Sequence, residues 1–232
     1  MCGRYILRET SAAERYFGLE RASWYFTASY NIAPTDEVPI VRLGKDHRRE
    51  GIMVRWGLIP YFAHGEPPKY STINATIEKL DTAPVWRGPW ERGRRCIMPA
   101  HGFYEWHVDA QGQKCPYFVE LADQPLFGFA GLWDASRRGD GTIVRSCAIV
   151  TMPGNELMRG IHNTGRNPYR MPAILRPEDH EAWLAGSATD AKGVLLQYPD
   201  DRMHAYRVST RVNTPKNNDA QLVEPLQSES NG

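Results

Sequence analysis

Turn-forming residues are spread along the whole chain, and this restricts the fold more than any other feature. The 232 residues include 17 prolines and 20 glycines, which are not gathered into one linker. Short strand-like runs lie between them, such as residues 38–43, 52–56 and 143–151. Many short strands separated by turn signals are typical of barrels and sandwiches. We predict an α+β fold, with residues 1–232 forming a single domain that has a mostly antiparallel, barrel-like β core and peripheral short helices.

Individual elements can be placed from local signals. Residues 38–43 and 52–56 flank a polar turn and predict a β-hairpin. Pro177 lies at the first turn of an amphipathic segment and Gly186 lies past its end, which predicts a short helix over residues 177–184. From Asn213 onward the sequence predicts irregular coil, with a disordered tail over about residues 226–232.

Composition and cysteine spacing exclude several classes of protein. No stretch reaches the length of a transmembrane helix, and the first residues do not resemble an export signal. The four cysteines, Cys2, Cys96, Cys115 and Cys147, show no paired spacing, as expected of free thiols in a reducing compartment. Zinc-binding motifs of the Cys-x-x-Cys and His-Glu-x-x-His types are lacking. We expect a cytoplasmic, monomeric protein with no membrane partner, no metal and no cofactor.

The first four residues, Met-Cys-Gly-Arg, are chemically unusual. Initiator methionine is normally trimmed before a small residue, which would leave Cys2 with both a free α-amine and a thiol. These groups titrate near pH ~8 and ~8.5, so a useful fraction of each is nucleophilic at neutral pH. Together they can close on one aldehyde to form a thiazolidine ring. The alternative is that Cys2 is a tolerated residue at a frayed terminus.

Three further polar residues have both a functional and an ordinary interpretation. Glu105 lies between aromatic residues on a strand-like segment, where it is either desolvated, with a raised pKa, or on the wet face of the strand; the sequence alone favours the wet face. Asn74 precedes a helix-like segment, so a helix cap would explain it. His162 lies in a loop, where a histidine is commonly a surface hydrogen-bonding group.

Charge and aromatic residues give weaker signals. The formal net charge of +1 neither requires nor excludes a nucleic-acid partner. Arg92, Arg94 and Arg95 form a cluster, although most such clusters are solvated surfaces. Tyr61 and Phe62 are consecutive, and adjacent residues of an extended chain face opposite sides. At least one of these two rings is therefore expected to meet solvent or a ligand.

Taken together, the motifs resemble those of the SOS-response-associated peptidase (SRAP) family. The matching segments are residues 1–4, 30–34, 56–60, 73–75, 95–99, 102–106, 129–133, 161–162 and 170–172. They follow the family's order from residue 2 to about residue 225, so the resemblance covers nearly the whole chain.

The resemblance implies both a partner and a reaction. It implies a single domain around a β core, with a positively charged groove for single-stranded DNA that contains abasic sites. In such proteins, the cysteine exposed by loss of methionine captures the ring-opened aldehyde of the abasic site as a thiazolidine crosslink, which shields the lesion from strand cleavage. Cys2 takes this role here, and the remaining active-site positions fall on Asn74, Glu105 and His162. The protein would then act in DNA repair and the SOS response, associated with the nucleoid when crosslinked.

These residue types suit the implied chemistry. A carboxyl group near neutral pKa, as at Glu105, can shuttle a proton from the amine to the departing hydroxyl. His162 titrates in the range needed to protonate the ring oxygen of the sugar. The amide of Asn74 can hold the α-amine or a sugar hydroxyl without adding charge.

The same resemblance suggests DNA contacts. Arg4 and Arg170 are candidates to clamp the phosphate backbone, while Tyr61 or Phe62 would wedge against bases near the lesion. Trp106, next to the candidate carboxylate, is included among the expected DNA contacts. Exposing an abasic site costs little because no base is paired there, and this favours single strands and junctions.

Two positions depart from the family pattern. Thr76 follows the Ile-Asn-Ala motif where arginine is usual. Residues 163–169 intervene between His162 and the Arg-Met-Pro run. This insertion would lengthen a surface loop, displace His162, or place Arg166 rather than Arg170 at the DNA.

Two other functions use the same residues. Cys2 with a nearby base would suit a Cys-dependent peptidase, a hydrolase that cuts its own Met1 or other peptides. A noncatalytic reader of single-stranded or modified DNA would use only the groove and its aromatic rings. Only the crosslinking reaction, with its lyase-like imine chemistry, requires a free amine on Cys2.

Overall fold

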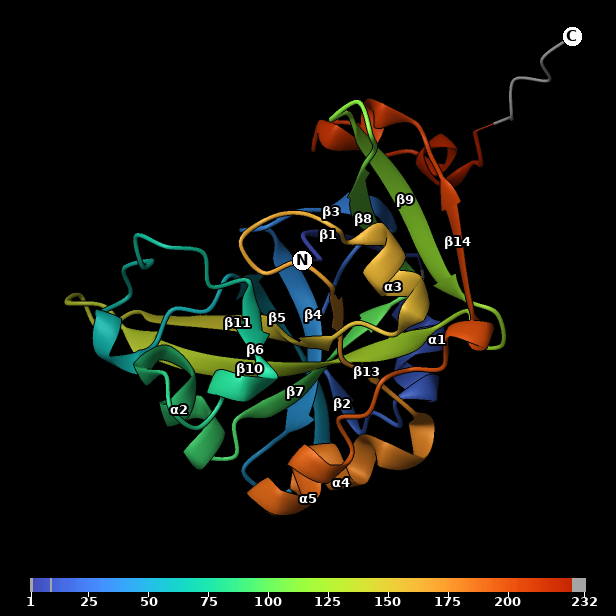
Figure 1. The fold of residues 1–232 in the computed structure, drawn as a ribbon. Helices are drawn as coiled ribbons and strands as arrows, with labels where there is room; N and C mark the ends of the chain where they lie inside the picture. Colours follow the sequence, from blue (N-terminus) through green and yellow to red (C-terminus); the bar gives the residue numbers. More distant parts are fainter. Residues whose placement is uncertain (1, 9, 227–232) are drawn as a thin grey trace, which may run out of the picture.

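Five strands close into a barrel at the centre of the protein (Figure 1). The structure is a computed structural model that describes residues 2–8 and 10–226. Neighbouring strands follow the order β11, β10, β7, β4 and β5, and β5 pairs again with β11, so the barrel has no open edge. The barrel strands are β4 (Glu37–Leu43), β5 (Arg49–Trp56), β7 (Arg95–Ala100), β10 (Phe127–Arg137) and β11 (Ile143–Pro153).

Most pairings in the barrel are antiparallel, as the sequence predicts. The parallel exceptions are β5 and β6 (Asn74–Thr76) against β11, and β2 (Arg21–Ala22) against β5. Two short strands, β12 (Arg170–Pro172) and β13 (Ile174–Leu175), pair with β11 and β10. The α+β fold class and its barrel-like core are confirmed.

A second, antiparallel sheet packs against the barrel. Its order is β14, β9, β8, β1 and β3. The bounds are β1 (Arg4–Leu7), β3 (Ser29–Ile32), β8 (Gly102–Val108), β9 (Lys114–Leu121) and β14 (Met203–Arg207). Only His101 separates β7 of the barrel from β8, so the chain passes directly from one sheet to the other.

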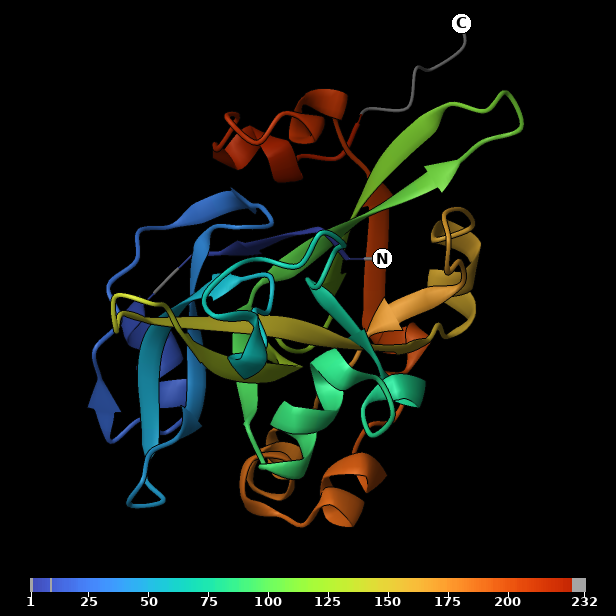
Figure 2. The ribbon, with the colours of Figure 1, turned by 90° about the vertical axis from the view of Figure 1, so that its left-hand side faces the viewer.

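Short helices lie around the periphery (Figure 2). The α-helices are α1 (Thr10–Tyr16), α2 (Pro84–Glu91), α3 (Glu156–Ile161), α4 (His180–Ala185) and α5 (Ala188–Gly193). The 3₁₀ helices are η1 (Tyr61–Ala63), η2 (Ile77–Lys79), η3 (Pro177–Asp179), η4 (Asp200–Arg202), η5 (Thr210–Asn213) and η6 (Ala220–Val223). The helix predicted over residues 177–184 is present as η3 followed by α4.

Buried aromatic rings join the two sheets. Tyr5 on β1 meets Trp56 of β5 edge-on at 5.3 Å and Phe129 of β10 at 5.9 Å between ring centroids. Phe103 on β8 meets the same Phe129 at 5.8 Å. All four side chains are fully buried, and edge-to-face contacts add to the free energy gained from burial. This cluster fixes β1 against the barrel and so determines where Cys2 lies.

The C-terminal segment differs from its prediction. Residues from Asn213 onward were expected to be irregular, yet η6 forms there. The Asp219 side chain accepts a hydrogen bond from the Gln221 backbone N–H, and Leu222 is buried. A side-chain cap and one buried apolar residue therefore order this short turn. Leu226 is described and exposed, whereas the rest of the predicted tail, residues 227–232, lies outside the described residues.

Candidate functional site

Cys2 lies two residues before the start of β1, and its side chain is buried. Its Sγ is 3.7 Å from the Arg4 carbonyl oxygen. Arg4 pairs with Tyr104 in the antiparallel register of β1 and β8, so continuing that register by one residue sets Gly3 opposite Glu105. The sequence-distant carboxyl group is thereby brought beside the N-terminal thiol.

Asn74 is bonded to the Cys2 main chain. Its Nδ2 donates to the Cys2 carbonyl oxygen at 3.0 Å, and its Oδ1 has no hydrogen-bond partner among the described residues. The side chain projects from β6, which pairs with β11, and does not cap a helix. The helix-cap interpretation was therefore wrong: the strand pairing of Asn74 with Ile149 overrides the local helix signal, and η2 starts only at Ile77.

Glu105 is buried, with 2% of its surface exposed. The preference for a wet strand face was wrong: β8 pairs with β1 on one side and β9 on the other, and α3 with the loop that follows it packs against β8. Its Oε1 accepts a hydrogen bond from the Trp106 backbone N–H at 3.1 Å. Burial raises the pKa of Glu105 above the ordinary value for a carboxyl group. The carboxyl is thus placed to exchange a proton nearer neutral pH.

The Cys2 thiol is not activated in this arrangement. Burial, followed by the charge of Glu105, raises the pKa of Cys2 well above its ordinary value. The thiol therefore stays protonated at neutral pH, and a base is needed before it can attack.

His162 caps the C-terminal end of α3 and is held by the last residue of the insertion and the residue after it. Its Nδ1 accepts from the Arg170 backbone N–H at 3.1 Å, so the neutral ring carries its hydrogen on Nε2. Its carbonyl accepts from the Tyr169 N–H at 2.7 Å. Burial lowers the pKa of His162 to about 4, below the range expected from an ordinary histidine. The ring is neutral at pH 7 and serves as a hydrogen-bond donor.

The inserted residues 163–169 form a loop whose two ends meet at His162. Asn163 anchors the loop to β8, because its side chain bonds both the N–H and the carbonyl of Val108, at 2.9 and 2.8 Å. Glu105 and His162 still line the same hollow, so the insertion does not separate them. The insertion supplies part of the wall of that hollow.

We call this hollow, of about 240 Å³, the site hollow. Glu105, Trp106 and His162 line it together with two exposed cations, Lys114 and Arg166. The Trp106 indole is fixed by its hydrogen bond of 2.8 Å to Asn213. The hollow is therefore buried and acidic at its base and cationic at its rim, which suits a neutral reacting group attached to an anionic chain.

The other predicted DNA contacts lie outside the lining of the site hollow. The Arg170 guanidinium makes a two-bond ion pair with Glu78, at 2.7 and 2.9 Å, and donates to the Thr151 carbonyl. Tyr61 and Phe62 are about half exposed and pack edge-on against each other on η1.

The Arg4 side chain is partly buried, and its Nε has no hydrogen-bond partner among the described residues.

Sequence reasoning missed Lys114. No motif marks it, and its neighbours in the sequence are an exposed turn. The signal was the β8–β9 hairpin, which pairs Lys114 with Val108 and so returns this cation to the strand that carries Glu105.

Among residues 2–8 and 10–226, no cluster of three or more His, Cys, Asp or Glu side chains is arranged to hold a metal ion. The described helices include none long and apolar enough to cross a membrane.

Comparison with known sequences decides the family. The sequence model described as SOS response associated peptidase (SRAP) matches residues 1–215. The chain belongs to the SRAP family. Abasic site processing protein YoqW of Bacillus subtilis (strain 168) is 37% identical over 230 residues, covering 97% of this chain and 99% of the relative. Abasic site processing protein HMCES of Pongo abelii is 27% identical over 239 residues, covering 87% of this chain and 66% of the relative.

Solved structures share the SRAP fold of this chain. A protein from Bacteroides thetaiotaomicron superposes with a TM-score of 0.85 at 24% identity, covering 97% of this chain and all (100%) of the other. One from Bordetella bronchiseptica gives a TM-score of 0.78 at 29% identity, with coverages of 90% and 100%.

Proposed function

We propose that this protein processes abasic sites in DNA by forming a covalent crosslink through Cys2 in single-stranded regions. The proposal rests on two linked observations: Glu105 and His162 line one small hollow, and Cys2, which Asn74 holds by its carbonyl, lies close enough to Glu105 for that carboxyl to raise the pKa of its thiol. Membership of the SRAP family supports it, as do relatives named abasic site processing proteins. Loss of Met1, by self-cleavage or by an aminopeptidase, comes first because it frees the α-amine.

The reaction balances with the loss of one water. The α-amine of Cys2 adds to the aldehyde carbon of the ring-opened sugar and gives a carbinolamine. The carbinolamine hydroxyl takes a proton and leaves as water, and an imine remains. The Cys2 sulfur then adds to the imine carbon, the thiol proton passes to the nitrogen, and a thiazolidine results.

Glu105 suits both proton transfers. Burial raises the pKa of Glu105, which favours its protonated form. In that form it can give a proton to the departing hydroxyl, and the carboxylate left behind can accept the proton of the thiol. The second role is needed because the pKa of Cys2 is raised: a protonated thiol needs a base beside it before it can attack the imine. One residue thus serves as acid and then as base.

His162 and Asn74 position the reacting groups. Because Arg170 N–H occupies Nδ1, the neutral His162 ring can donate from Nε2 to the ring oxygen of the closed sugar and assist its opening. Asn74 holds the Cys2 carbonyl with Nδ2, while its Oδ1 remains an acceptor for the amine or a sugar hydroxyl. Neither residue carries a charge at neutral pH.

Lys114 and Arg166 at the rim would receive the flanking phosphates. Thr76 supplies no charge where the family pattern has arginine, and Arg170 is already paired with Glu78. Phosphate contacts therefore move to the β8–β9 hairpin and to the inserted loop.

A peptidase remains the second candidate, because the family description contains that word. A thiol peptidase requires a stabilised thiolate, whereas burial and Glu105 raise the pKa of Cys2. The electrostatics of the site favour a reaction in which the amine attacks first.

The test uses a single-stranded oligonucleotide with one abasic site and a denaturing gel. Wild-type protein lacking Met1 is expected to give a heat-stable shifted band, which Cys2→Ala and an undamaged oligonucleotide abolish. Cys2→Ser is the matched control, because its amine can still form an imine but its hydroxyl closes the ring poorly. No band from wild-type protein with a free Cys2 amine would refute the proposal, and cleavage of unrelated peptides would support the peptidase.

A further inference from the structure

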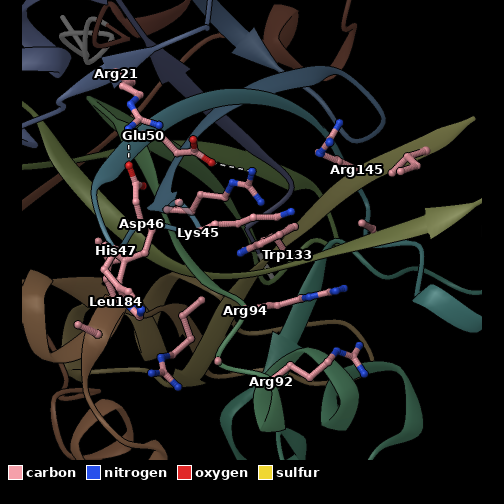
Figure 3. Close-up of a pocket in the computed structure, with 18 residues that line it drawn as sticks. Arg21, Lys45, Asp46, His47, Glu50, Arg92, Arg94, Trp133, Arg145 and Leu184 are labelled. Carbon is pink, nitrogen blue, oxygen red and sulfur yellow. Dashed lines mark hydrogen bonds and ion pairs between the residues drawn. The ribbon is translucent and has the colours of Figure 1, made fainter.

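A second and larger hollow, of about 1010 Å³, lies at one end of the barrel. Its wall is formed where β4 ends, β5 and β7 begin, and β10 and β11 approach and leave their connecting turn. Figure 3 shows its side chains arranged around Trp133. We call it the barrel-end hollow.

The barrel-end hollow is strongly cationic. Seven lysine and arginine residues line it against two carboxylates, a local excess of five positive charges in a chain whose overall charge is +1. A concave surface with one sign of charge focuses the electrostatic potential and attracts polyanions. The excess positive charge of the protein is therefore concentrated here.

Part of this charge is already paired, and part is available. Arg42 is bound to Glu50 at 2.6 Å, and Arg21 is bound to Asp46. Lys45 and Arg145 are exposed and form no ion pair within residues 2–8 and 10–226. In Figure 3 both side chains reach toward the space beside Trp133.

Two guanidinium groups in this hollow lie over an aromatic ring. The Arg42 guanidinium lies 4.1 Å from the centroid of Trp133, and that of Arg94 lies 5.2 Å from it. Arg94 is also bound to the buried carboxylate of Asp134, which fixes its position. Because guanidinium groups cover the ring, the site suits phosphates better than a stacked base.

The barrel-end hollow connects to the exposed aromatic pair on η1. The Arg92 guanidinium, which lines the hollow, lies 4.5 Å from the centroid of the Tyr61 ring. Asp134 accepts the Tyr61 backbone N–H at 2.9 Å and also pairs with Arg92 at 3.4 Å. Tyr61 and Phe62 therefore sit at the edge of the cationic surface.

The two hollows are distinct, but one DNA strand can reach both. Asn74, which holds Cys2, pairs with Ile149 on β11, and Arg145 lies four residues earlier on the same strand. At about 3.3 Å per residue this separation is roughly 13 Å along the strand. A DNA strand bound at Cys2 covers such a distance in a few nucleotides.

We propose that the barrel-end hollow binds the phosphodiester backbone of the same DNA strand beyond the lesion, after the strand passes the Tyr61–Phe62 pair. The inference rests on the proposed function for its ligand. Contacts through phosphates make this binding independent of base sequence. The hollow anchors the flanking strand, while the site hollow receives the abasic sugar.

The test measures binding of undamaged single-stranded DNA to the Cys2→Ala protein, so that no crosslink contributes. Fluorescence anisotropy with oligonucleotides of about 6 and about 20 nucleotides, over a range of salt, gives the affinity and its salt dependence. Lys45→Gln with Arg145→Gln is expected to weaken binding of the long oligonucleotide roughly tenfold and to reduce its salt slope by about 1.4. Binding of the short oligonucleotide should change less than twofold.

Lys216→Gln is the control, because Lys216 is exposed and lines neither hollow. The proposal is overturned if the double variant binds the long oligonucleotide like the parent, or if both lengths weaken equally. Inorganic tripolyphosphate that binds the hollow without displacing the long oligonucleotide would also overturn it. These outcomes are separate from the gel test of crosslinking, since wild-type protein can crosslink with or without this anchor.

Discussion

Asn74→Ala should slow crosslinking by loosening Cys2. The bond from Asn74 Nδ2 to the Cys2 carbonyl is 3.0 Å long and buried. Loss of the donor leaves a buried carbonyl without this partner, at a cost of about 1–3 kcal/mol. If the activation free energy of crosslinking rises by the same amount, the rate falls roughly 5- to 150-fold. Asn74→Asp keeps the shape but sets a carboxylate against the carbonyl, so it should be at least as slow.

The assay is single-turnover crosslinking of an abasic oligonucleotide with protein in excess, quenched at intervals and resolved on a denaturing gel. Affinity for an undamaged oligonucleotide is measured alongside and should stay within twofold, because Asn74 carries no charge. Urea unfolding separates loss of folding from loss of rate. If both variants crosslink at the wild-type rate, Asn74 does not position Cys2 and the reasoning fails.

Three other variants test separate parts of the account. Lys114→Gln with Arg166→Gln should weaken binding of a short abasic oligonucleotide roughly tenfold in a filter-binding assay while leaving the rate at saturation unchanged; a rate loss at saturation would show that these cations do more than hold phosphates. Burial lowers the pKa of His180 to about 4. As pH falls, the unfolded chain therefore binds more protons at this residue than the folded protein does, and the free energy of unfolding decreases. Between pH 8 and 5 this loss is about 2 kcal/mol, and His180→Gln should remove it in urea unfolding at the two pH values; an unchanged pH dependence would contradict the low pKa. Gly128→Ala places a Cβ 2.2 Å from Ile97 Cγ2 in the barrel wall. Thermal unfolding should show a loss of about 1–3 kcal/mol in the free energy of unfolding, whereas unchanged stability would mean that Ile97 moves to make room.

Local patterns predicted the elements of the fold, and long-range pairing decided the environments of the site residues. The hairpin of β4 and β5 followed from alternation and a polar turn. The burial of Glu105 did not, because it depends on elements far away in the chain: β1 pairs with β8, and α3 packs against it. Asn74 carried a helix signal that pairing with β11 overrode.

The cationic surface, too, depends on long-range pairing that local sequence patterns do not show. Arg92, Arg94 and Arg95 were visible as a cluster, but their convergence with Lys45 and Arg145 depends on closure of the barrel. Lys114 was missed for the same reason, since only the hairpin register returns it to Glu105. The family motifs predicted the candidate site residues, and the structure supplied their burial and hydrogen bonds.

The central claim concerns the bond formed at Cys2, and mass spectrometry of the crosslinked N-terminal peptide tests it most directly. After nuclease and protease digestion, the account predicts a peptide that begins at Cys2, lacks Met1, and carries the abasic sugar with the loss of one water. Fragmentation should place both the nitrogen and the sulfur of Cys2 in the adduct. An adduct on any other residue, or a crosslinked peptide that retains Met1, would contradict the account.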